Sequence, residues 1–452
     1  MTPSTANCRT ANEIRRTEQG PRPIPPTGVA GPIAELPNVD VSLANGLRVI
    51  AVRQPATPMV EIRLWIPFAG WEPAHPARAE LLAASITTGC ENNGSLAPVG
   101  GSLVAEVTPE RLLISGQVLT SGLSLLLETV AHTLTSPEYV GDCVLDERRR
   151  LTTQLQMLER DAAVIARRAL QRQRFGKHPA AAEMSTADAI AEINPKELRD
   201  LHKTAVVPRG ATLVLVGDID VDDAVSQADR ALRDWTSSTA AQQLTSLPVI
   251  TGGPLLFMSN EEAQDSQIRL SAQAVGRTHP KYPAVVLANL TLGGYFASRL
   301  AANLHGADKL HTYHAHSYIE LHAGTGSVVV EIDATTEATA EVLNETRYEL
   351  ARLLYQPPGD AEVAAAREYA LGAMHFASAT QAGLAAQLVA LAGTGLGMPW
   401  LLGMHSRLVN TSPTEITQAA QEFLTPVNWT GTVVANPSQL AVLAKFCAVT
   451  GP

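Results

Sequence analysis

The sequence predicts an α+β protein of two homologous lobes, each a mainly antiparallel sheet covered by helices, arranged together as a clam-shell. The chain has 452 residues, which at roughly 100–200 residues per domain allows two to four domains. Its apolar residues, 45% of the chain, alternate with period two in some segments and follow helical spacing in others. The order of these segments repeats in the second half, which indicates a duplicated fold.

The first lobe is expected to begin near Leu36 with a strand pair. In VSLANGLRVIAV, Asn45 and Gly46 separate two apolar alternations, which is the strongest short signal of a hairpin. The elements expected after it are a strand at 60–70, a helix at 75–88, two strands around Thr108 and Pro109, a helix from Ser121, a helical stretch from about 142 to 174 and an apolar strand between Gly210 and Gly217.

The second lobe repeats this order. QIRLSAQAVG at 267–276 is similar to EIRLWIPFAG at 61–70, and a helix is expected next at 281–304. Two strands, a helix, a proline-containing turn and a long helix follow, as they do in the first lobe. SPTEITQAAQEFLTPVNWTGTVVA near the end then matches the pattern of NPKELRDLHKTAVVPRGATLVLVG.

These patterns divide the chain into four segments. We expect a disordered Pro-rich leader at 1–35, a first lobe at 36–237, a linker at 238–253 and a second lobe at 254–452. Two similar lobes joined by one linker imply a cleft between them, which is a common position for a ligand site.

Charge and composition exclude several classes of protein. The formal net charge is -10, and no cluster of Lys and Arg is large enough for a nucleic-acid surface. No apolar run reaches the ~18 residues needed to span a bilayer, and the N-terminus has no apolar core of a secretory signal. The sequence therefore predicts no nucleic-acid partner and no membrane span.

The four cysteines are Cys8, Cys90, Cys143 and Cys447. They are far apart and include no CxxC pair, so we expect neither a disulfide framework nor a cysteine-based zinc site. A reducing compartment is the simplest interpretation, and we expect a cytoplasmic protein.

The start of the first lobe resembles the pitrilysin/insulinase family of zinc peptidases, which includes heterodimeric processing peptidases. Asn45-Gly46-Leu47-Arg48-Val49 matches the opening strand pair of that family, and Gly89 matches the glycine that follows its HxxEH helix. The resemblance implies duplicated α+β lobes and zinc held by two His of HxxEH and a Glu on a later helix, with the Glu of the motif as general base.

The metal motif itself is absent. Counting back from Gly89, the HxxEH positions are Glu80, Leu81, Leu82, Ala83 and Ala84, so both His ligands and the base are missing. On the later helix Glu147 is kept, but the ligand position falls on Gln154, and an amide is a poor zinc ligand. The resemblance thus implies a chain with no catalytic residues, no metal and no cofactor of its own.

The second lobe keeps more of the family pattern. LGGYFASRLAANLHGADKLHTYHAHS at 292–317 matches the family's substrate-contacting segment at Gly293, Gly294 and Arg299. Allowing one inserted residue, Tyr313 takes the position of the family's substrate-binding Tyr. The Arg of that pair is replaced by His305, which can donate to a carbonyl but lacks the bidentate fork of Arg.

Histidines crowd the same segment. If 314–322 is a strand, His314, His316 and His322 share one face, so a metal site there is one interpretation. The other is a polar strand that faces the cleft or solvent, because no acidic partner falls at a recognisable spacing in the sequence.

Two functions follow from the resemblance. The first is a non-catalytic subunit of a heterodimeric zinc metallopeptidase, whose homologous partner carries HxxEH and zinc and which cleaves peptides, including leader or precursor peptides. The second is a scaffold or binding protein of the same fold without any peptidase role. A stand-alone enzyme with a metal on the histidine strand is a third reading.

Overall fold

The computed structural model describes residues 31–87, 96–137, 139, 141–240, 245–304, 312–322 and 324–449. Of these, residues from Pro32 onward belong to one compact unit. The predicted leader at 1–35 lies almost wholly outside the described residues, as do Gly89 and His305.

Strands and helices alternate in the first half in the expected order. The elements are β1 Asn38–Ser42, β2 Arg48–Arg53, β3 Met59–Pro67, α2 His75–Ile86, β4 Ser102–Val107, β5 Arg111–Leu119, α4 Leu123–Thr135, α5 Gly141–Leu158, α6 Ala162–Phe175, α7 Ala187–Glu192, α8 Pro195–Ala205, β6 Thr212–Gly217 and α9 Val221–Leu232.

The second half repeats the pattern and adds helices. Its elements are β7 Leu255–Ser259, β8 Asp265–Val275, α10 Tyr282–Asn289, the π-helix η4 Leu290–Gly294, α11 Arg299–Leu304, β9 Thr312–His322, β10 Thr325–Thr335, α12 Thr339–Tyr355, α13 Asp360–Ser378, α14 Gln381–Ala392, α15 Met398–Asn410, α16 Pro413–Phe423, β11 Thr430–Ala435, α17 Leu440–Leu443 and β12 Cys447–Val449.

Each half builds one six-stranded sheet. The strand orders are β1-β2-β6-β3-β5-β4 and β12-β7-β11-β8-β10-β9, so β3 and β8 hold equivalent positions, as do β5 and β10 and the edge strands β4 and β9. Most pairs are antiparallel, and the parallel pairs are β2–β6, β7–β11 and β7–β12. The predicted pair of α+β lobes is thus confirmed.

The predicted hairpin forms where the sequence places it. Gly46 adopts φ 88, a left-handed conformation that favours glycine, and its N–H donates to the Leu43 carbonyl at 2.9 Å. The Asn45 side chain accepts from the Leu47 N–H and donates to the Leu232 carbonyl at 3.0 Å. A local turn signal therefore also ties the hairpin to α9.

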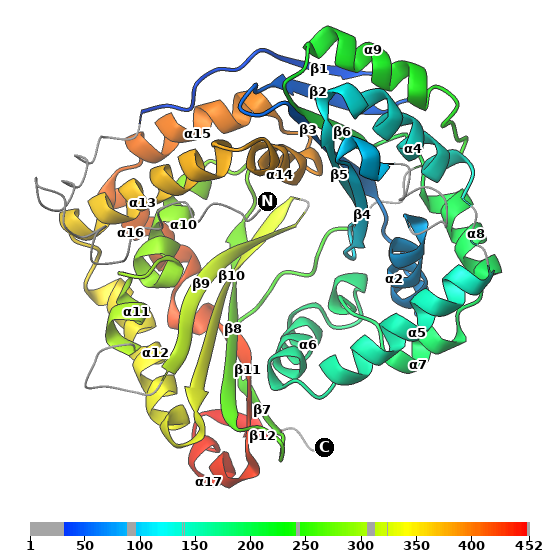
Figure 1. The fold of residues 1–452 in the computed structure, drawn as a ribbon. Helices are drawn as coiled ribbons and strands as arrows, with labels where there is room; N and C mark the ends of the chain where they lie inside the picture. Colours follow the sequence, from blue (N-terminus) through cyan, green and yellow to red (C-terminus); the bar gives the residue numbers. More distant parts are fainter. Residues whose placement is uncertain are drawn as a thin grey trace, which may run out of the picture. The chain divides into compact units, whose positions relative to one another are not determined.

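Each half contributes helices that pack on the sheet of the other (Figure 1). One face of the first sheet packs on helices of its own half, and the opposite face, which carries Ile50 and Val214, packs on α14 and α15 of the second half. In return, α6 of the first half packs on β8 and β11 of the second sheet. The contact surface between the halves is therefore built mostly from helices that each half donates.

Two expected helices are interrupted. The stretch from 142 to 174 breaks after Leu158, because Asp161 caps a new helix by accepting from the N–H groups of Ala163 and Val164. The predicted helix at 281–304 becomes α10, η4 and α11, with an irregular segment before Arg299.

Two expectations about composition need correction. The stretch Tyr282–Leu304 is long and apolar enough to cross a membrane, contrary to the expectation that no such run exists. Of its apolar window, 72% is buried inside the fold, as in the core helix of a globular protein.

Cys143 is disulfide-bonded, so the expectation that the cysteines form no cross-link is wrong for this residue.

Candidate functional site

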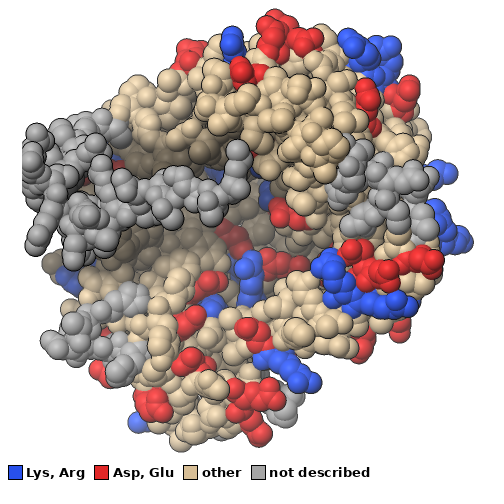
Figure 2. All heavy atoms as spheres, viewed as in Figure 1, with Lys and Arg blue, Asp and Glu red and all other residues tan. Residues whose placement is uncertain are grey.

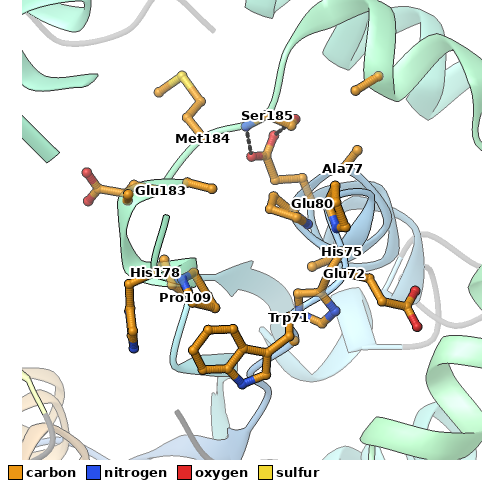
Figure 3. Close-up of a pocket in the computed structure, with 18 of the residues that line it drawn as sticks. Trp71, Glu72, His75, Ala77, Glu80, Pro109, His178, Glu183, Met184 and Ser185 are labelled. Carbon is orange, nitrogen blue, oxygen red and sulfur yellow. Dashed lines mark hydrogen bonds between the residues drawn. The ribbon is translucent and has the colours of Figure 1, made fainter. Parts of the chain in front are cut away.

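A cavity of 530 Å³ lies beside the helix that aligns with the missing zinc motif. It is bounded by the segment from Gly70 to His75, the N-terminal turns of α2, the turn at Thr108 and Pro109, and the segment 176–189 (Figure 3). α2 begins at His75 with a proline in its first turn, and its Ala/Leu-rich face is buried against the sheet. The fold thus keeps a recess at this helix although the metal motif is absent.

The carboxylate of Glu80, the residue predicted at the position of the first His ligand, already has partners. The Ser185 N–H donates to one oxygen at 2.6 Å and the Ser185 hydroxyl donates to the other at 2.7 Å. Burial raises the pKa of Glu80, although the hydrogen bonds from Ser185 act in the opposite direction. Glu80 therefore fixes the segment that closes the cavity, as the dashed lines in Figure 3 show.

The remaining motif positions do not fit a zinc ion. Ala83 is 4% exposed inside the core of the first half, and Ala83 and Ala84 offer only methyl groups. Gln154 is exposed on α5 and accepts from Arg150 at 3.4 Å, whereas Glu147 accepts from the same Arg150 at 2.7 Å. No carboxylate or imidazole of these positions remains to hold a metal.

Sequence reasoning did not single out two histidines that line this cavity. His75 is buried, and its Nε2 lies 3.1 Å from the Phe68 carbonyl. Burial lowers the pKa of His75, so the ring is neutral near pH 7. His178 faces Thr245 at 3.1 Å and receives the edge of the Trp71 ring. Both imidazoles have structural partners, which are Phe68 for His75 and Trp71 and Thr245 for His178.

The substrate segment predicted in the second half is only partly accessible. Tyr313 is 68% exposed near the start of β9. Asp333 pairs with His314 and Ala334 pairs with Thr312, so Tyr313 is the extra residue of a β-bulge. Bulges re-aim side chains and are frequent beside functional sites.

Arg299, which was predicted to contact substrate, is buried in the structure. It is 6% exposed, and its guanidinium donates to both carboxylate oxygens of Glu362 and to the Gln356 carbonyl. This arrangement holds the start of α13 and leaves little of the side chain for a peptide.

Gly293 and Gly294 form the end of the π-helix η4. Gly293 is buried, and a Cβ added to it would lie 2.8 Å from the Ser317 hydroxyl and 2.9 Å from Leu300. The glycine thus permits η4 to pack closely on β9. His305, the expected replacement of the family Arg, lies outside the described residues.

A buried charge cluster joins the halves, and no sequence pattern predicted it. Arg174, near the end of α6, lies 2.5 Å from Glu320 of β9 and donates to the hydroxyls of Ser271 and Ser327. His322 lies between Glu110 of the first half at 3.1 Å and Glu320 at 3.4 Å. The cluster therefore ties β9 both to α6 and to the turn between β4 and β5.

The cluster shifts the pKa of its members in opposite directions. Burial would lower the pKa of His322, but its contacts with Glu110 and Glu320 outweigh burial and raise it to about 9. Burial would raise the pKa of Glu320, but His322 and Arg174 outweigh burial and lower it to about 2. At neutral pH His322 is therefore protonated and Glu320 is ionised.

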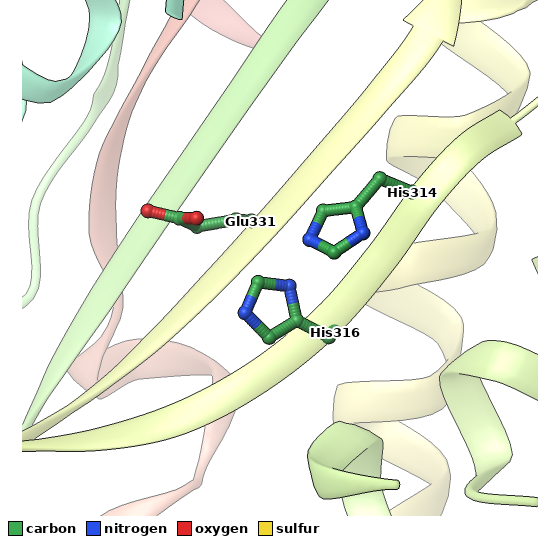
Figure 4. Close-up of side chains that lie close together, drawn as sticks. All are labelled: His314, His316 and Glu331. Atoms are coloured by element: carbon green, nitrogen blue, oxygen red, sulfur yellow. The ribbon is translucent and has the colours of Figure 1, made fainter. Parts of the chain in front are cut away.

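The histidines of β9 separate into two groups. His322 belongs to the charge cluster, whereas His314 and His316 face Glu331 of β10 (Figure 4). The sequence showed no acidic partner for these histidines at a recognisable spacing. The structure provides one, because Glu331 of β10 lies directly opposite His316 in the β9–β10 ladder.

Charges of both signs surround the hollow on the face seen in Figure 2. Acidic and basic side chains alternate over this face and form no continuous basic area there. A separate pocket of 330 Å³ lies between the halves, lined by Trp65 and Arg111 of the first and by Arg277 and His322 of the second. The Nε of Arg111 is buried without a hydrogen-bond partner in the described structure.

Known proteins resemble both the sequence and this architecture. The family described as "Peptidase M16 inactive domain" matches residues 192–369. An uncharacterized zinc protease of Mycobacterium leprae is 23% identical over 304 residues, which cover 64% of this chain and 67% of the relative. One of Mycobacterium tuberculosis is 23% identical over 337 residues, covering 72% of this chain and 76% of the relative.

Solved structures share the fold over most of the chain. A peptidase M16 inactive domain from Pseudomonas fluorescens superposes with a TM-score of 0.80 at 20% identity, covering 89% of this chain and 98% of that one. A protease from Helicobacter pylori gives a TM-score of 0.81 at 15% identity, covering 88% and 100%. The predicted clam-shell fold and the resemblance to zinc peptidases agree with these comparisons.

Proposed function

We propose that this chain, which is similar to the peptidase M16 inactive domain over residues 192–369, is the non-catalytic subunit of a heterodimeric zinc metallopeptidase that cleaves peptides. The observation that carries the proposal is the chemistry at Glu80, Ala83, Ala84 and Gln154. The family's fold surrounds these positions, but one carboxylate is held by Ser185, two side chains are methyl groups and one is an exposed amide. A homologous partner carrying HxxEH would supply zinc and the general base.

This chain would supply half of the chamber wall and part of the peptide contact. The strands β4 and β9 are sheet edges, and an extended peptide adds to such an edge through main-chain hydrogen bonds. Tyr313 is exposed on the bulge of β9, where an aromatic side chain can cover the peptide.

The pocket between the halves offers a second contact. Arg111 and Arg277 line it from opposite halves, and the buried Nε of Arg111 has a hydrogen-bond donor to offer. Peptide carbonyls and carboxylates are the acceptors that such donors accommodate. Leader or precursor peptides processed in the cytoplasm are the substrates we propose.

The experiment is an affinity purification of this chain from its native host, with identification of the co-purifying proteins by mass spectrometry. We expect a chain of similar size that carries HxxEH. Zinc-dependent peptide cleavage should require both chains, and this chain alone should show none. Recovery with proteins that lack any peptidase motif would contradict the proposal and favour a scaffold role for the same fold.

A further inference from the structure

We propose that His314, His316 and Glu331 form a binding site for a zinc-class divalent ion in the sheet of the second half. The site is distinct from the degenerate motif on α2 and does not rest on the proposed peptidase partnership. One ligand atom from each of the three side chains lies within 4.8 Å of the others (Figure 4). Two imidazoles and one carboxylate make a donor set that zinc prefers.

Strand register brings the three side chains together. His316 pairs directly with Glu331, and His314 is two residues away on the same face of β9. The rings of His314 and His316 have their centroids 4.2 Å apart. Zinc ligands in a tetrahedron are about 3.3 Å apart, so a small side-chain rotation, chiefly of the exposed His314, completes the geometry.

One ring nitrogen of His316 is free to coordinate an ion. Its Nδ1 is buried and has no hydrogen-bond partner in the described structure. A neutral imidazole is the form that binds a metal, and coordination would satisfy a buried nitrogen that otherwise lacks a partner.

The surroundings also favour a cation. Glu331 accepts a hydrogen bond from the Tyr318 hydroxyl at 3.1 Å, which fixes the carboxylate as outer-shell partners of metal ligands do. Arg269 lies 3.8 Å from Glu331 but only 2.8 Å from Asp333, so Asp333 offsets most of its charge. With two carboxylates against one guanidinium, the pocket retains one negative charge for the ion.

The equivalent place in the first half shows that the fold does not require these residues. Following β4, β5 and β3 by register, the positions of His314, His316 and Glu331 correspond to Ser102, Val104 and Ser115. The first sheet therefore fills the same three positions with two hydroxyls and an aliphatic side chain. The donor set is a feature of the second sheet alone among the described strands.

Three protein ligands leave one position of a tetrahedral ion for water or another molecule. The nitrogen donors favour zinc, cobalt or nickel over magnesium and calcium, which prefer all-oxygen sites. The site thus has the ligand number of an open metal centre, and it lies on the edge strand next to Tyr313.

The test is titration of the purified, chelator-treated full chain, without any partner, with zinc by calorimetry and with cobalt by visible absorption. We expect one high-affinity ion per chain, tetrahedral cobalt bands and no binding of magnesium. His316→Ala should lower the affinity by more than about 100-fold, and Tyr318→Phe by about 10-fold, since outer-shell changes cost 10–100-fold.

Two further variants keep the test decisive. Glu331→Gln preserves the shape of the side chain and should also abolish tight binding, even if His316→Ala is poorly folded. His132→Ala, which removes an exposed histidine of α4, should leave the titration unchanged. Absence of tight zinc binding, or tight binding that survives both His316→Ala and Glu331→Gln, would overturn the proposal.

Discussion

The guanidinium of Arg174 lies 2.5 Å from the carboxylate of Glu320, and this ion pair joins a helix of the first half to the edge strand of the second. The Arg174 side chain is 2% exposed and also contacts Gln171, Ser271 and Ser327. Because charges so deeply buried must be paired, this contact makes the exchange of α6 between the halves specific.

Arg174→Ala should destabilise the protein by about 1–3 kcal/mol, because Glu320 keeps only His322 as a cation and the buried hydroxyls of Ser271 and Ser327 lose their donor. Urea unfolding followed by circular dichroism measures the change. Arg172→Ala, an exposed position on the same helix, should change the free energy of unfolding by less than about 0.5 kcal/mol. Equal effects of the two substitutions would show that the buried pair has no special role.

Because of His322, the free energy of unfolding should fall as the pH becomes alkaline. Its pKa is raised from a usual value of 6.5 to about 9 by Glu110 and Glu320. The protonated ring therefore stabilises the fold fully below pH 6.5, and the stabilisation disappears as the pH rises through about 9. The loss should be on the order of 3 kcal/mol.

Unfolding midpoints measured between pH 6 and 10 test this dependence on His322. The decrease of the unfolding midpoint with rising pH should be absent in His322→Gln. It should be retained in His279→Gln, which replaces an exposed imidazole before α10. A slope that persists in His322→Gln would assign it to other groups.

Gly293→Ala should destabilise the fold by about 1–3 kcal/mol, because the added methyl overlaps Ser317 and Leu300 in a packed region. Gly372→Ala is the matched control, since no atom lies within 4 Å of its added Cβ in the middle of α13. That control should stabilise the protein by up to about 1 kcal/mol through helix propensity. Thermal unfolding of both variants distinguishes a close contact from a general intolerance of alanine.

Tyr313→Ala should lower kcat/KM of the two-chain peptidase by about 10-fold while leaving the unfolding midpoint of this chain unchanged, because the side chain is 68% exposed. If Tyr313 contacts the peptide equally in the substrate complex and in the transition state, its loss should raise KM and leave kcat constant. Tyr355→Ala, at an 87% exposed position on α12, is the control. An active pair with unchanged kinetics for Tyr313→Ala would remove this tyrosine from the peptide contact.

Local sequence signals predicted the elements well where the cause is local. The Asn45-Gly46 turn, the period-two strands and the repeated order of segments each depend on neighbouring residues, and the structure contains them. The loss of metal chemistry at Glu80, Ala83, Ala84 and Gln154 could also be read from residue types alone, because a methyl group cannot ligate an ion. Helix ends were less predictable, since the cap at Asp161 divides a stretch whose composition is uniformly helical.

The sequence by itself determined a duplicated α+β chain without the zinc motif, because periodicity and side-chain chemistry are properties of short segments. Only the tertiary structure decided which residues meet across distance. The pairing of α6 and α14 with the opposite sheets, the bond between Arg174 and Glu320, and the meeting of His316 with Glu331 depend on packing and strand register. The helix pairings and the bond between Arg174 and Glu320 exist only once the two halves have folded together, whereas His316 meets Glu331 through the β9–β10 register within the second half.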